Sequence, residues 1–577
     1  MGETKNLWPA ERRIAYFSME IAIDPAIPTY SGGLGVLAGD TLRAAADLSV
    51  PIVAVTLLSE QGYFTQLLDK DGNQSAAPTN WDIRGLLGDP HTERVTVEIE
   101  GRAVQIRAWQ RDIAGATGSN VPVLLLDTNL DENSAFDRTL TQRLYGGDKR
   151  YRLCQEVVLG IGGVRMLTAL GYRGIAKHHM NEGHAALLAL ELFREETLRS
   201  SCSLDKIGEC LARVGTEVRT KCVFTTHTPV AAGHDRFSYD LIRQVLGEYM
   251  PQDLLRTLGG EDEFNMTLLA MHLSHYVNSV ARQHKHVSEH LFPGYQFSSI
   301  TNGVHSATWT CPEVAKLFDI HIPNWRQDSF DLRYALRIPE HEIWDAHQAV
   351  KRRLVEYVNT RMNAGFDAET FTIGFARRAT AYKRMDLLFH DIKRLRQIGQ
   401  GQKLQIIFAG KAHPNDTEGQ DLIRKIHWHM GEVRDVIRIV YLADYDVNLA
   451  KLLVPGVDIW LNTPARPKEA SGTSGMKAAH NGVPQMSIQD GWWMEGHIEG
   501  VTGWEIGPVP TEQNESVNDD GADAEELYDK LEHIVLPLYY TDRAGWMKLM
   551  RNCIAFNASF FNTHRMVQQY ALHAYLI

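Results

Sequence analysis

Short apolar segments alternate with helical patterns along most of the chain, and this alternation restricts the folds that it can adopt. The segments are rich in β-branched and aromatic residues and end at glycine or polar residues, which is typical of buried strands. They cover residues 14–18, 52–55, 121–126, 371–375, 404–409, 437–442 and 457–461, and residues 95–109 alternate around Gly101 as a hairpin does. Strands that alternate with helices predict an α/β fold with parallel sheets.

Length and charge exclude several classes of protein. The 577 residues predict about two to four domains, and 44% hydrophobic residues are enough for large cores. A net charge of −12, from 59 basic and 71 acidic side chains, argues against nucleic acid or an anionic membrane as a partner. No apolar run is long enough to span a bilayer, the start at Met1 does not resemble a signal peptide, and the six cysteines are scattered. We therefore expect a cytoplasmic protein.

Two glycine-rich turns stand between a predicted strand and a predicted helix. The first is a loop at residues 30–40, before a helical pattern at 42–48. The second covers residues 469–475, before a helical run that Gly482 or Pro484 would end. This geometry presents backbone N–H groups to an anion such as phosphate, although a tight strand–helix connection without a ligand uses the same residue types.

Lys477 lies just inside the second of these helices, beside Met476, Ala478 and Ala479. These neighbours predict a largely buried turn, and a buried lysine is costly unless its charge is paired or its amine has a chemical use. An amine at a phosphate-binding helix start suits pyridoxal phosphate held as a Schiff base. A capped helix whose lysine reaches the surface explains the same local pattern.

Three histidines and a glutamate are concentrated in one short segment. The spacing of His178, His179, Glu182 and His184 fits no common zinc motif. We therefore predict no metal ligand there and assign none elsewhere in the chain.

Polar and basic residues follow two further strands. His227 comes directly after an apolar segment at 222–225, where ligands of open α/β sheets bind, although a hydrogen-bonded core histidine fits the same position. Four cations follow the strand at 371–375, namely Arg377, Arg378, Lys383 and Arg384. In a net acidic chain this concentration indicates an anion site, and a solvated loop is the alternative.

The stretch from Glu469 to Asn481, with Asp490-Gly491-Trp492-Trp493 after it, resembles the cofactor-lysine signature of the α-glucan phosphorylases, which act on glycogen, starch or maltodextrin. It is close to the short bacterial branch of that family. Segments similar to the other motifs of the family follow one another in the family's order, from about Ile14 to Leu576.

The resemblance implies two Rossmann-like domains facing a cleft, the GT-B arrangement of many glycosyltransferases. We expect an N-terminal sugar-binding domain at residues 1–300 and a C-terminal cofactor-binding domain at residues 301–577. The last helix, at about 558–577, would cross back and pack on the first domain. Residues 511–524 are polar and acidic, which predicts a surface loop.

The resemblance also implies a cofactor, pyridoxal 5′-phosphate. Lys477 would anchor it and Arg377 would face its phosphate group. The positions that match the family's cofactor contacts are Lys477, Arg377, Thr473, Ser474, Tyr445 and Trp309.

Substrate contacts are implied in the same way. Gly33, Arg378 and Lys383 would hold the substrate phosphate. The expected sugar contacts are Glu182, His184, His227, Asn302, Glu469, Ser471 and Gly472. The expected catalytic residues are Lys477, Arg378, Lys383 and His227.

The implied reaction is reversible phosphorolysis with retention of configuration. Orthophosphate would cleave the terminal α-1,4-linked glucosyl unit of an α-glucan or maltodextrin and give α-glucose 1-phosphate. The leaving oxygen needs a proton, and no glycosidase carboxylate pair is apparent in the sequence. In the family the substrate phosphate supplies that proton, supported by the cofactor phosphate.

Two matters stay open at this stage. The chain is much shorter than the animal and plant members, so we expect their phosphorylation and nucleotide control to be absent, and a homodimer is one of the possible oligomeric states. The alternative function is a nucleotide-sugar glycosyltransferase of the starch-synthase type. Such an enzyme would share the two domains but would bind no pyridoxal phosphate and would not need Lys477.

Overall fold

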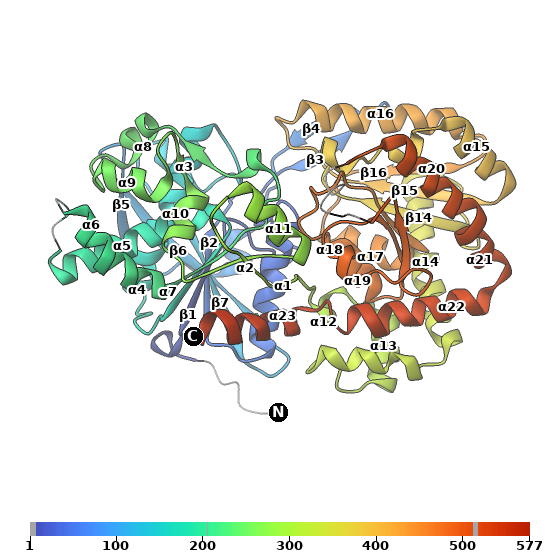
Figure 1. The fold of residues 1–577 in the computed structure, drawn as a ribbon, viewed down its shortest axis with the longest axis horizontal. Coiled ribbons are helices and arrows are strands. Elements are labelled where there is room, and N and C mark those ends of the chain that lie inside the picture. The colour runs from blue at the N-terminus through green and yellow to red at the C-terminus, as the bar shows by residue number, and fades with distance from the viewer. Residues whose placement is uncertain (1–6, 203, 205, 510, 512–516, 577) are drawn as a thin grey trace.

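The computed structural model describes residues 7–202, 204, 206–509, 511 and 517–576. It contains two large sheets, one in each half of the sequence, with helices around both (Figure 1). The mixed α/β fold with large parallel sheets, which the strand pattern predicts, is therefore confirmed. None of the described helices combines the length and the apolar character that a bilayer-crossing helix requires.

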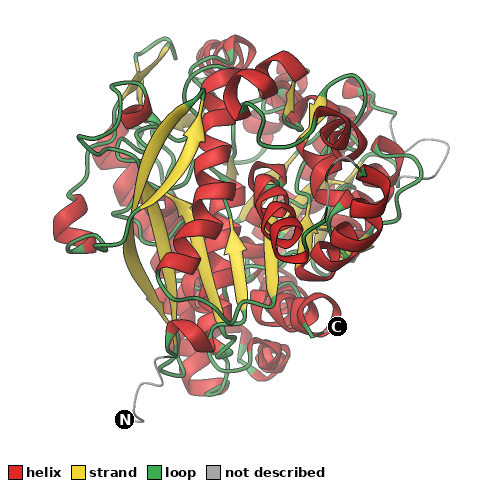
Figure 2. Ribbon diagram, turned by 90° about the vertical axis from the view of Figure 1, so that its left-hand side faces the viewer, coloured by secondary structure: helices red, strands yellow, loops and turns green. Residues whose placement is uncertain are grey.

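The sheet of the N-terminal half has nine strands in the order β13-β12-β9-β8-β1-β2-β7-β6-β5. From one edge to the other they span Ser298–Ser299, Tyr276–Ser279, Cys222–Thr225, Lys177–Asn181, Ile14–Phe17, Ile52–Leu57, Asn120–Asp127, Arg102–Ala114 and Val95–Ile99. All neighbours are parallel except β7 with β6 and β6 with β5. The antiparallel pair β5–β6 is the hairpin predicted around Gly101. Figure 2 shows strands of this half running side by side, with helices packed around them.

The sheet of the C-terminal half has six parallel strands in the order β16-β15-β14-β17-β18-β19. They span Arg438–Leu442, Leu404–Ala409, Phe371–Ala376, Ile459–Asn462, Gln485–Ile488 and Gly503–Ile506. The first four were predicted because they are continuous apolar runs. The sequence pattern misses β18 and β19 because each has only four residues and includes a buried or half-buried polar side chain.

Helices cover both sheets. In the N-terminal half the longer ones are α1 (Gly33–Asp47), α3 (Lys149–Val157), α5 (Leu187–Ser200), α8 (Tyr239–Leu246), α9 (Gln252–Gly259) and α11 (Arg282–Leu291). In the C-terminal half the main ones are α13 (Pro312–His321), α14 (Glu340–Met362), α15 (Ile392–Gly401), α16 (Thr417–Val433), α17 (Val447–Gly456), α20 (Asp520–Lys530), α22 (Arg543–Asn552) and α23 (Thr563–Tyr570). Two short helices, α12 (Ser306–Trp309) and α18 (Thr473–Ala479), lie near the centre of the molecule.

Helix α1 begins earlier than the sequence predicts. Residues 33–40 are helical, whereas the glycine pattern predicts a loop as far as residue 40. The glycines serve close packing: a Cβ on Gly35 would lie 2.6 Å from Glu20 Oε2, and one on Gly39 would lie 2.2 Å from the Ala22 carbonyl oxygen. Glycine weakens a helix by about 1 kcal/mol, but only glycine fits against this neighbouring loop.

The predicted surface loop at residues 511–524 is wrong at its C-terminal end. Helix α20 begins at Asp520, and the Asp519 side chain caps it by accepting the Ala522 N–H. The helix dipole favours acidic residues at a helix start. The acidic residues of this segment therefore mark the N-terminus of α20 and not a loop. Residues 512–516 of the prediction lie outside the described residues.

Two segments connect the halves of the molecule. Helix α23 packs on the nine-stranded sheet, where Tyr570 shares a hydrogen bond of 3.1 Å with Thr225 (Figure 1). In the opposite direction, the hairpin β3–β4 (Thr65–Leu68 and Gln74–Ala77) reaches the C-terminal half. There Gln66 Nε2 donates to the Gly410 carbonyl at 2.9 Å, and Gln74 Nε2 donates to the Ala412 carbonyl at 2.8 Å.

Candidate functional site

The predicted site residues gather at the carboxyl ends of parallel strands. Glu182 follows β8, His227 follows β9, and Arg377 follows β14. Residues from both sheets meet here, because Arg378 Nη2 lies 3.3 Å from Ser31 Oγ. Carboxyl ends of strands are where open α/β sheets bind ligands.

Lys477 is buried, with 8% of its surface exposed, and lies in α18. Its Nζ atom is 3.9 Å from the centroid of the Trp309 indole ring. Among the described residues no side chain or carbonyl forms a hydrogen bond or ion pair with Nζ. Burial lowers the pKa of this amine to about 8, and the carboxylate of Asp40 acts in the opposite direction. The amine is therefore far easier to deprotonate than that of an ordinary lysine.

Trp309 is held in place by Asp40, whose Oδ2 accepts the indole N–H at 2.7 Å. Both residues are buried, and Asp40 lies in α1 whereas Trp309 ends α12. The tryptophan beneath the lysine is therefore fixed by the N-terminal half of the chain.

Two cations of the run after β14 converge on one carboxylate. Glu469 Oε2 accepts hydrogen bonds from Lys383 Nζ at 2.8 Å and from Arg377 Nη2 at 2.5 Å. Burial alone would raise the pKa of Glu469, but Arg377 and Lys383 together lower it to about 2. Glu469 is thus an ionised carboxylate that orients two cations at the edge of the site.

Arg378 and the glycine turn lie together. A Cβ on Gly32 would be 3.1 Å from Arg378 Nη2, so this glycine lets the guanidinium approach the backbone. Gly33 is exposed and faces open space, and Arg378 is exposed as well. An anion could reach both from solvent.

The histidine cluster after β8 and β9 is organised by Glu182. Glu182 adopts a φ of 79°, which is uncommon for a residue with a side chain. Its Oε2 accepts the His227 N–H at 2.7 Å and the Thr228 hydroxyl at 2.8 Å. His227 Nε2 in turn lies 2.8 Å from Asn181 Oδ1, and burial lowers the pKa of His227 to about 3. The ring is therefore neutral near pH 7.

Several buried polar atoms of the predicted site have no hydrogen-bond partner among the described residues. They are His184 Nδ1, Asn302 Oδ1, Ser471 Oγ and Arg377 Nη1. Buried donors and acceptors are nearly always paired, so these four atoms are available to bond to a polar ligand.

Two residues that hold this site together, Glu20 and Asp490, have no role assigned to them from the sequence. Glu20 Oε2 accepts the N–H groups of Ser31 at 2.6 Å and Gly32 at 3.2 Å, and its Oε1 accepts the Tyr145 hydroxyl at 2.8 Å. Asp490 Oδ2 accepts the Glu469 N–H at 2.8 Å. Glu20 comes shortly after β1 and Asp490 shortly after β18, so position relative to a strand end was the available signal.

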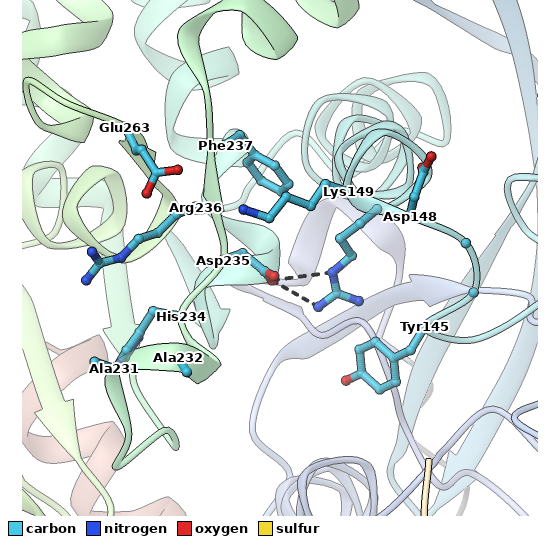
Figure 3. A pocket seen from close by; sticks show the side chains of 13 residues that line it. Tyr145, Asp148, Lys149, Ala231, Ala232, His234, Asp235, Arg236, Phe237 and Glu263 are labelled. Atoms are coloured by element: carbon cyan, nitrogen blue, oxygen red, sulfur yellow. Dashed lines mark hydrogen bonds and ion pairs between the residues drawn. The ribbon is translucent and has the colours of Figure 1, made fainter. Parts of the chain in front are cut away.

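A cavity of about 620 Å³ is lined by residues of the segments 145–152 and 231–237 and by Glu263 (Figure 3), and it adjoins the histidine cluster at Asp235. Asp235 connects the two, because its Oδ2 lies 3.6 Å from His184 Nε2 and accepts two hydrogen bonds from Arg152, at 3.0 and 3.3 Å. The Arg152 guanidinium stacks over the Tyr145 ring at 4.6 Å. Other charged and aromatic lining residues are Asp148, Lys149, Arg236, Phe237 and Glu263. Aromatic faces with donors and acceptors of both charges suit a polar, hydroxyl-rich ligand.

The residues around Lys477 fit the pyridoxal phosphate that the resemblance implies. Such a group needs an amine that deprotonates easily, a flat side chain beside its ring, and a cation for its phosphate. Lys477 and Trp309 supply the first two features, and Arg377, whose Nη1 has no hydrogen-bond partner among the described residues, is the cation that the resemblance assigns to the phosphate. Tyr445 is half-buried near Tyr30, and Ser474, whose Oγ accepts the Trp460 indole N–H at 3.1 Å, stands with Thr473 in the first turn of α18.

Fold and site together define an α/β protein with a lysine- and arginine-containing site at its strand ends. Comparison with known proteins gives the family. The family model described as carbohydrate phosphorylase matches residues 235–506. The chain belongs to the carbohydrate phosphorylase family, which confirms the resemblance seen in the sequence.

Individual relatives cover nearly the whole chain. A maltodextrin phosphorylase of Thermococcus litoralis is 39% identical over 97% of this chain and 70% of its own length. A glycogen phosphorylase of Mycobacterium tuberculosis is 35% identical over the same shares of the two chains. An uncharacterized protein of Methanocaldococcus jannaschii is 33% identical over 97% of this chain and 99% of its own length.

Proposed function

We propose that the protein is a retaining α-1,4-glucan phosphorylase that uses pyridoxal 5′-phosphate. Orthophosphate cleaves the terminal glucosyl unit of an α-glucan or maltodextrin, and α-glucose 1-phosphate is released reversibly. The observation that carries the proposal is the buried amine of Lys477, which lies against Trp309 without a hydrogen-bond or ion-pair partner among the described residues. A structural lysine would have a paired charge.

The proposal includes the domain arrangement. Residues 1–300 form a Rossmann-like sugar-binding domain and residues 301–577 a Rossmann-like cofactor-binding domain, with the cleft of a GT-B fold between them. The separate nine- and six-stranded sheets and the packing of α23 on the first sheet support this division.

The residues at the strand ends take distinct parts. Arg378, Lys383 and the backbone at Gly33 bind the orthophosphate, whose oxygen forms a bond to the anomeric carbon while the bond from that carbon to the glucan oxygen breaks. The proton for the departing glucan oxygen comes from the orthophosphate. His227 contacts the glucosyl unit as a neutral ring, because a pKa of about 3 makes it a poor proton donor near pH 7.

Sugar hydroxyls form hydrogen bonds with the buried polar atoms of His184, Asn302 and Ser471 that have no partner among the described residues. Glu182, Glu469 and Gly472 are within two residues of His184 or Ser471 in the sequence, and they take part in binding the glucosyl unit. The remaining glucan extends into the cavity beside Asp235.

The cofactor is held by Lys477, with Arg377, Thr473 and Ser474 toward its phosphate and Tyr445 and Trp309 along its ring. When bound, it supplies a second phosphate group next to the orthophosphate. The cations Arg377, Arg378 and Lys383 offset the repulsion between two such anions, which would otherwise be several kcal/mol at contact distance.

The first experiment is the absorption spectrum of purified protein before and after borohydride reduction, followed by peptide mapping. A pyridoxyl adduct on Lys477 supports the proposal. A spectrum without cofactor absorbance, from folded protein supplied with pyridoxal phosphate, contradicts it.

The second experiment separates two kinds of glycosyl transfer. Maltodextrin and orthophosphate should yield glucose 1-phosphate, and ADP-glucose or UDP-glucose with maltodextrin should yield no chain extension. The reverse pattern would establish a nucleotide-sugar glycosyltransferase in place of a phosphorylase.

A further inference from the structure

Two histidines and an aspartate from distant parts of the sequence meet at one carboxylate oxygen. His305 Nε2 lies 2.8 Å from Asp47 Oδ2, and His564 Nε2 lies 3.0 Å from the same atom. The three side chains are 7%, 7% and 4% exposed for Asp47, His305 and His564. Among the described residues this is the group whose ligand atoms all lie close enough together to hold a metal ion.

Each of the three side chains is oriented by a second contact. His305 Nδ1 lies 2.7 Å from Thr308 Oγ1, and His564 Nδ1 lies 3.3 Å from Ser329 Oγ. Asp47 Oδ1 accepts the Ala116 N–H at 2.6 Å. Histidines that bind metal commonly donate their other ring N–H to an oxygen, which fixes the tautomer and aims the free nitrogen at the ion.

The electrostatic environment favours a cation at this point. Asp40 lies two turns before Asp47 in α1, and its Oδ2 accepts the His305 N–H at 3.2 Å. Two buried carboxylates are thus close to His305. The charge of Asp40 is also shared with Arg43, at 3.5 Å, and with the amine of Lys477, whose pKa it raises, so Asp47 is the carboxylate that a bound ion would use. Among the described residues Asp47 has no lysine or arginine partner, and its carboxylate is held by the two histidine rings and the Ala116 N–H.

We propose that Asp47, His305 and His564 form a binding site for a divalent transition-metal ion, with zinc as the best match. Imidazole nitrogens and a carboxylate oxygen are ligands that zinc prefers, at about 2.0–2.2 Å. Bonds of that length around a tetrahedral ion separate the ligand atoms by about 3.3 Å. The observed 2.8 and 3.0 Å contacts need to open by only a few tenths of an ångström.

Binding of the ion requires the Nε2 lone pair of each ring, so each histidine carries its ring proton on Nδ1 in the metal-bound state. The hydroxyl oxygens of Thr308 and Ser329 are placed to accept those protons. Three protein ligands leave a fourth position, which water fills.

The ion would join three segments that the chain brings together only when it is fully folded. Asp47 ends α1, His305 immediately precedes α12, and His564 lies in the first turn of α23. The bound ion would therefore connect α1 to α23. Because the ion binds the folded protein and not the unfolded chain, it should raise the thermal midpoint.

The test uses full-length protein without an affinity tag, freed of metal by chelation and then titrated with zinc chloride. The variants are His564→Gln, which removes one ligand, and His286→Asn/His290→Asn, which removes an exposed histidine pair one turn apart on α11. We expect one zinc ion per wild-type chain, at least about tenfold weaker binding to His564→Gln, and unchanged binding to the α11 double variant.

Wild-type protein alone provides a second measurement, in case His564→Gln does not fold. Zinc should raise the thermal midpoint of metal-free protein, and cobalt(II) should give the visible spectrum of a four- or five-coordinate ion with nitrogen and oxygen ligands. Absence of bound zinc, or zinc that binds His564→Gln as tightly as wild type, overturns the proposal. Zinc that is lost in the α11 double variant overturns it as well, because the ion then sits at the surface.

Discussion

The backbone N–H of Glu469 donates a hydrogen bond of 2.8 Å to Asp490 Oδ2, so two acidic residues hold each other at the start of the loop before α18. Their surroundings separate their acidities. Arg377 and Lys383 bring the pKa of Glu469 down to about 2, whereas burial raises the pKa of Asp490 to about 7. Glu469 stays ionised for contact with cations, and Asp490 keeps a proton in weakly acidic solution.

This difference predicts how stability depends on pH at Asp490. The folded state binds a proton up to about pH 7, whereas an unfolded aspartate releases it near pH 4. The stabilisation from that proton is complete below about pH 4 and is lost as the pH rises through 7, by at most about 1.4 kcal/mol per pH unit. Asp490→Asn should therefore gain stability relative to wild type between about pH 5 and 7, with a constant difference above 8.

The measurement is the thermal midpoint of both proteins across that pH range. Asp240→Asn, at an exposed position of α8, controls for the loss of a carboxylate. A difference between Asp490→Asn and wild type that does not vary with pH would show that Asp490 is ionised throughout.

The amine of Lys477 provides a second pH dependence. With a pKa of about 8, its neutral fraction rises about fivefold from pH 7 to 8 and less than twofold from pH 8 to 9. An ordinary lysine gains nearly tenfold in each of these steps. The measurement mixes cofactor-free protein with pyridoxal phosphate at several pH values and traps the product with borohydride. The yield of labelled Lys477 should follow the pH dependence of an amine with a pKa of about 8. Exposed Lys206 is the internal comparison, and a tenfold rise per pH unit at both lysines would contradict the low pKa.

The sequence predicted those strands and helix residues whose burial shows in the apolar character of their immediate neighbours. β14 and β15 were predictable because each is a continuous apolar run that is buried along its length. Lys477 was singled out because its neighbours in the same helix are apolar. The start of α1 was predicted at the wrong residue because its glycines are required for close packing against Glu20 and Ala22. The local sequence does not show that these residues lie there.

The contacts that complete the site depend on tertiary structure and could not be predicted. Glu20 acts on Ser31 and on Tyr145, which is 125 residues away. Asp47 and His564 are 517 residues apart, so no spacing rule could bring them together. The cavity beside Asp235 likewise is lined by three separate segments, around residues 145–152, residues 231–237 and Glu263.

The third prediction concerns Glu20, whose carboxylate accepts the backbone N–H groups of Ser31 and Gly32 in the glycine turn. Glu20→Gln keeps the size of the side chain but replaces one of the accepting oxygens by an amide NH₂. The turn at Ser31 and Gly32 should loosen, and the KM for orthophosphate should rise about tenfold, as expected for a lost hydrogen bond to a charged group. Tyr145→Phe removes only the third contact and should raise that KM less. Steady-state kinetics decide, and equal effects of the two substitutions would exclude the turn as the cause.

The cations after β14 should divide between phosphate binding and stability, although the sequence presents them as one run. Arg378 is exposed and touches only Ser31 Oγ by hydrogen bonding among the described residues, whereas Arg384 is buried and pairs with Asp520 at 2.6 Å and Asp523 at 2.8 Å. Arg378→Lys keeps the charge but loses the planar fork that grips phosphate, so the KM for orthophosphate should rise about tenfold or more while the thermal midpoint stays within about two degrees. Arg384→Lys should lower the midpoint by several degrees, with little change in that KM. A lysine cannot keep all the hydrogen bonds that the buried guanidinium donates, which include those to the carbonyl oxygens of Thr463 at 3.1 Å and Pro464 at 3.0 Å. Kinetics and thermal melts of the two variants are the measurements: Arg378→Lys should change the KM and Arg384→Lys the thermal midpoint. A lower midpoint for Arg378→Lys without a change in the KM would place Arg378 outside the phosphate site.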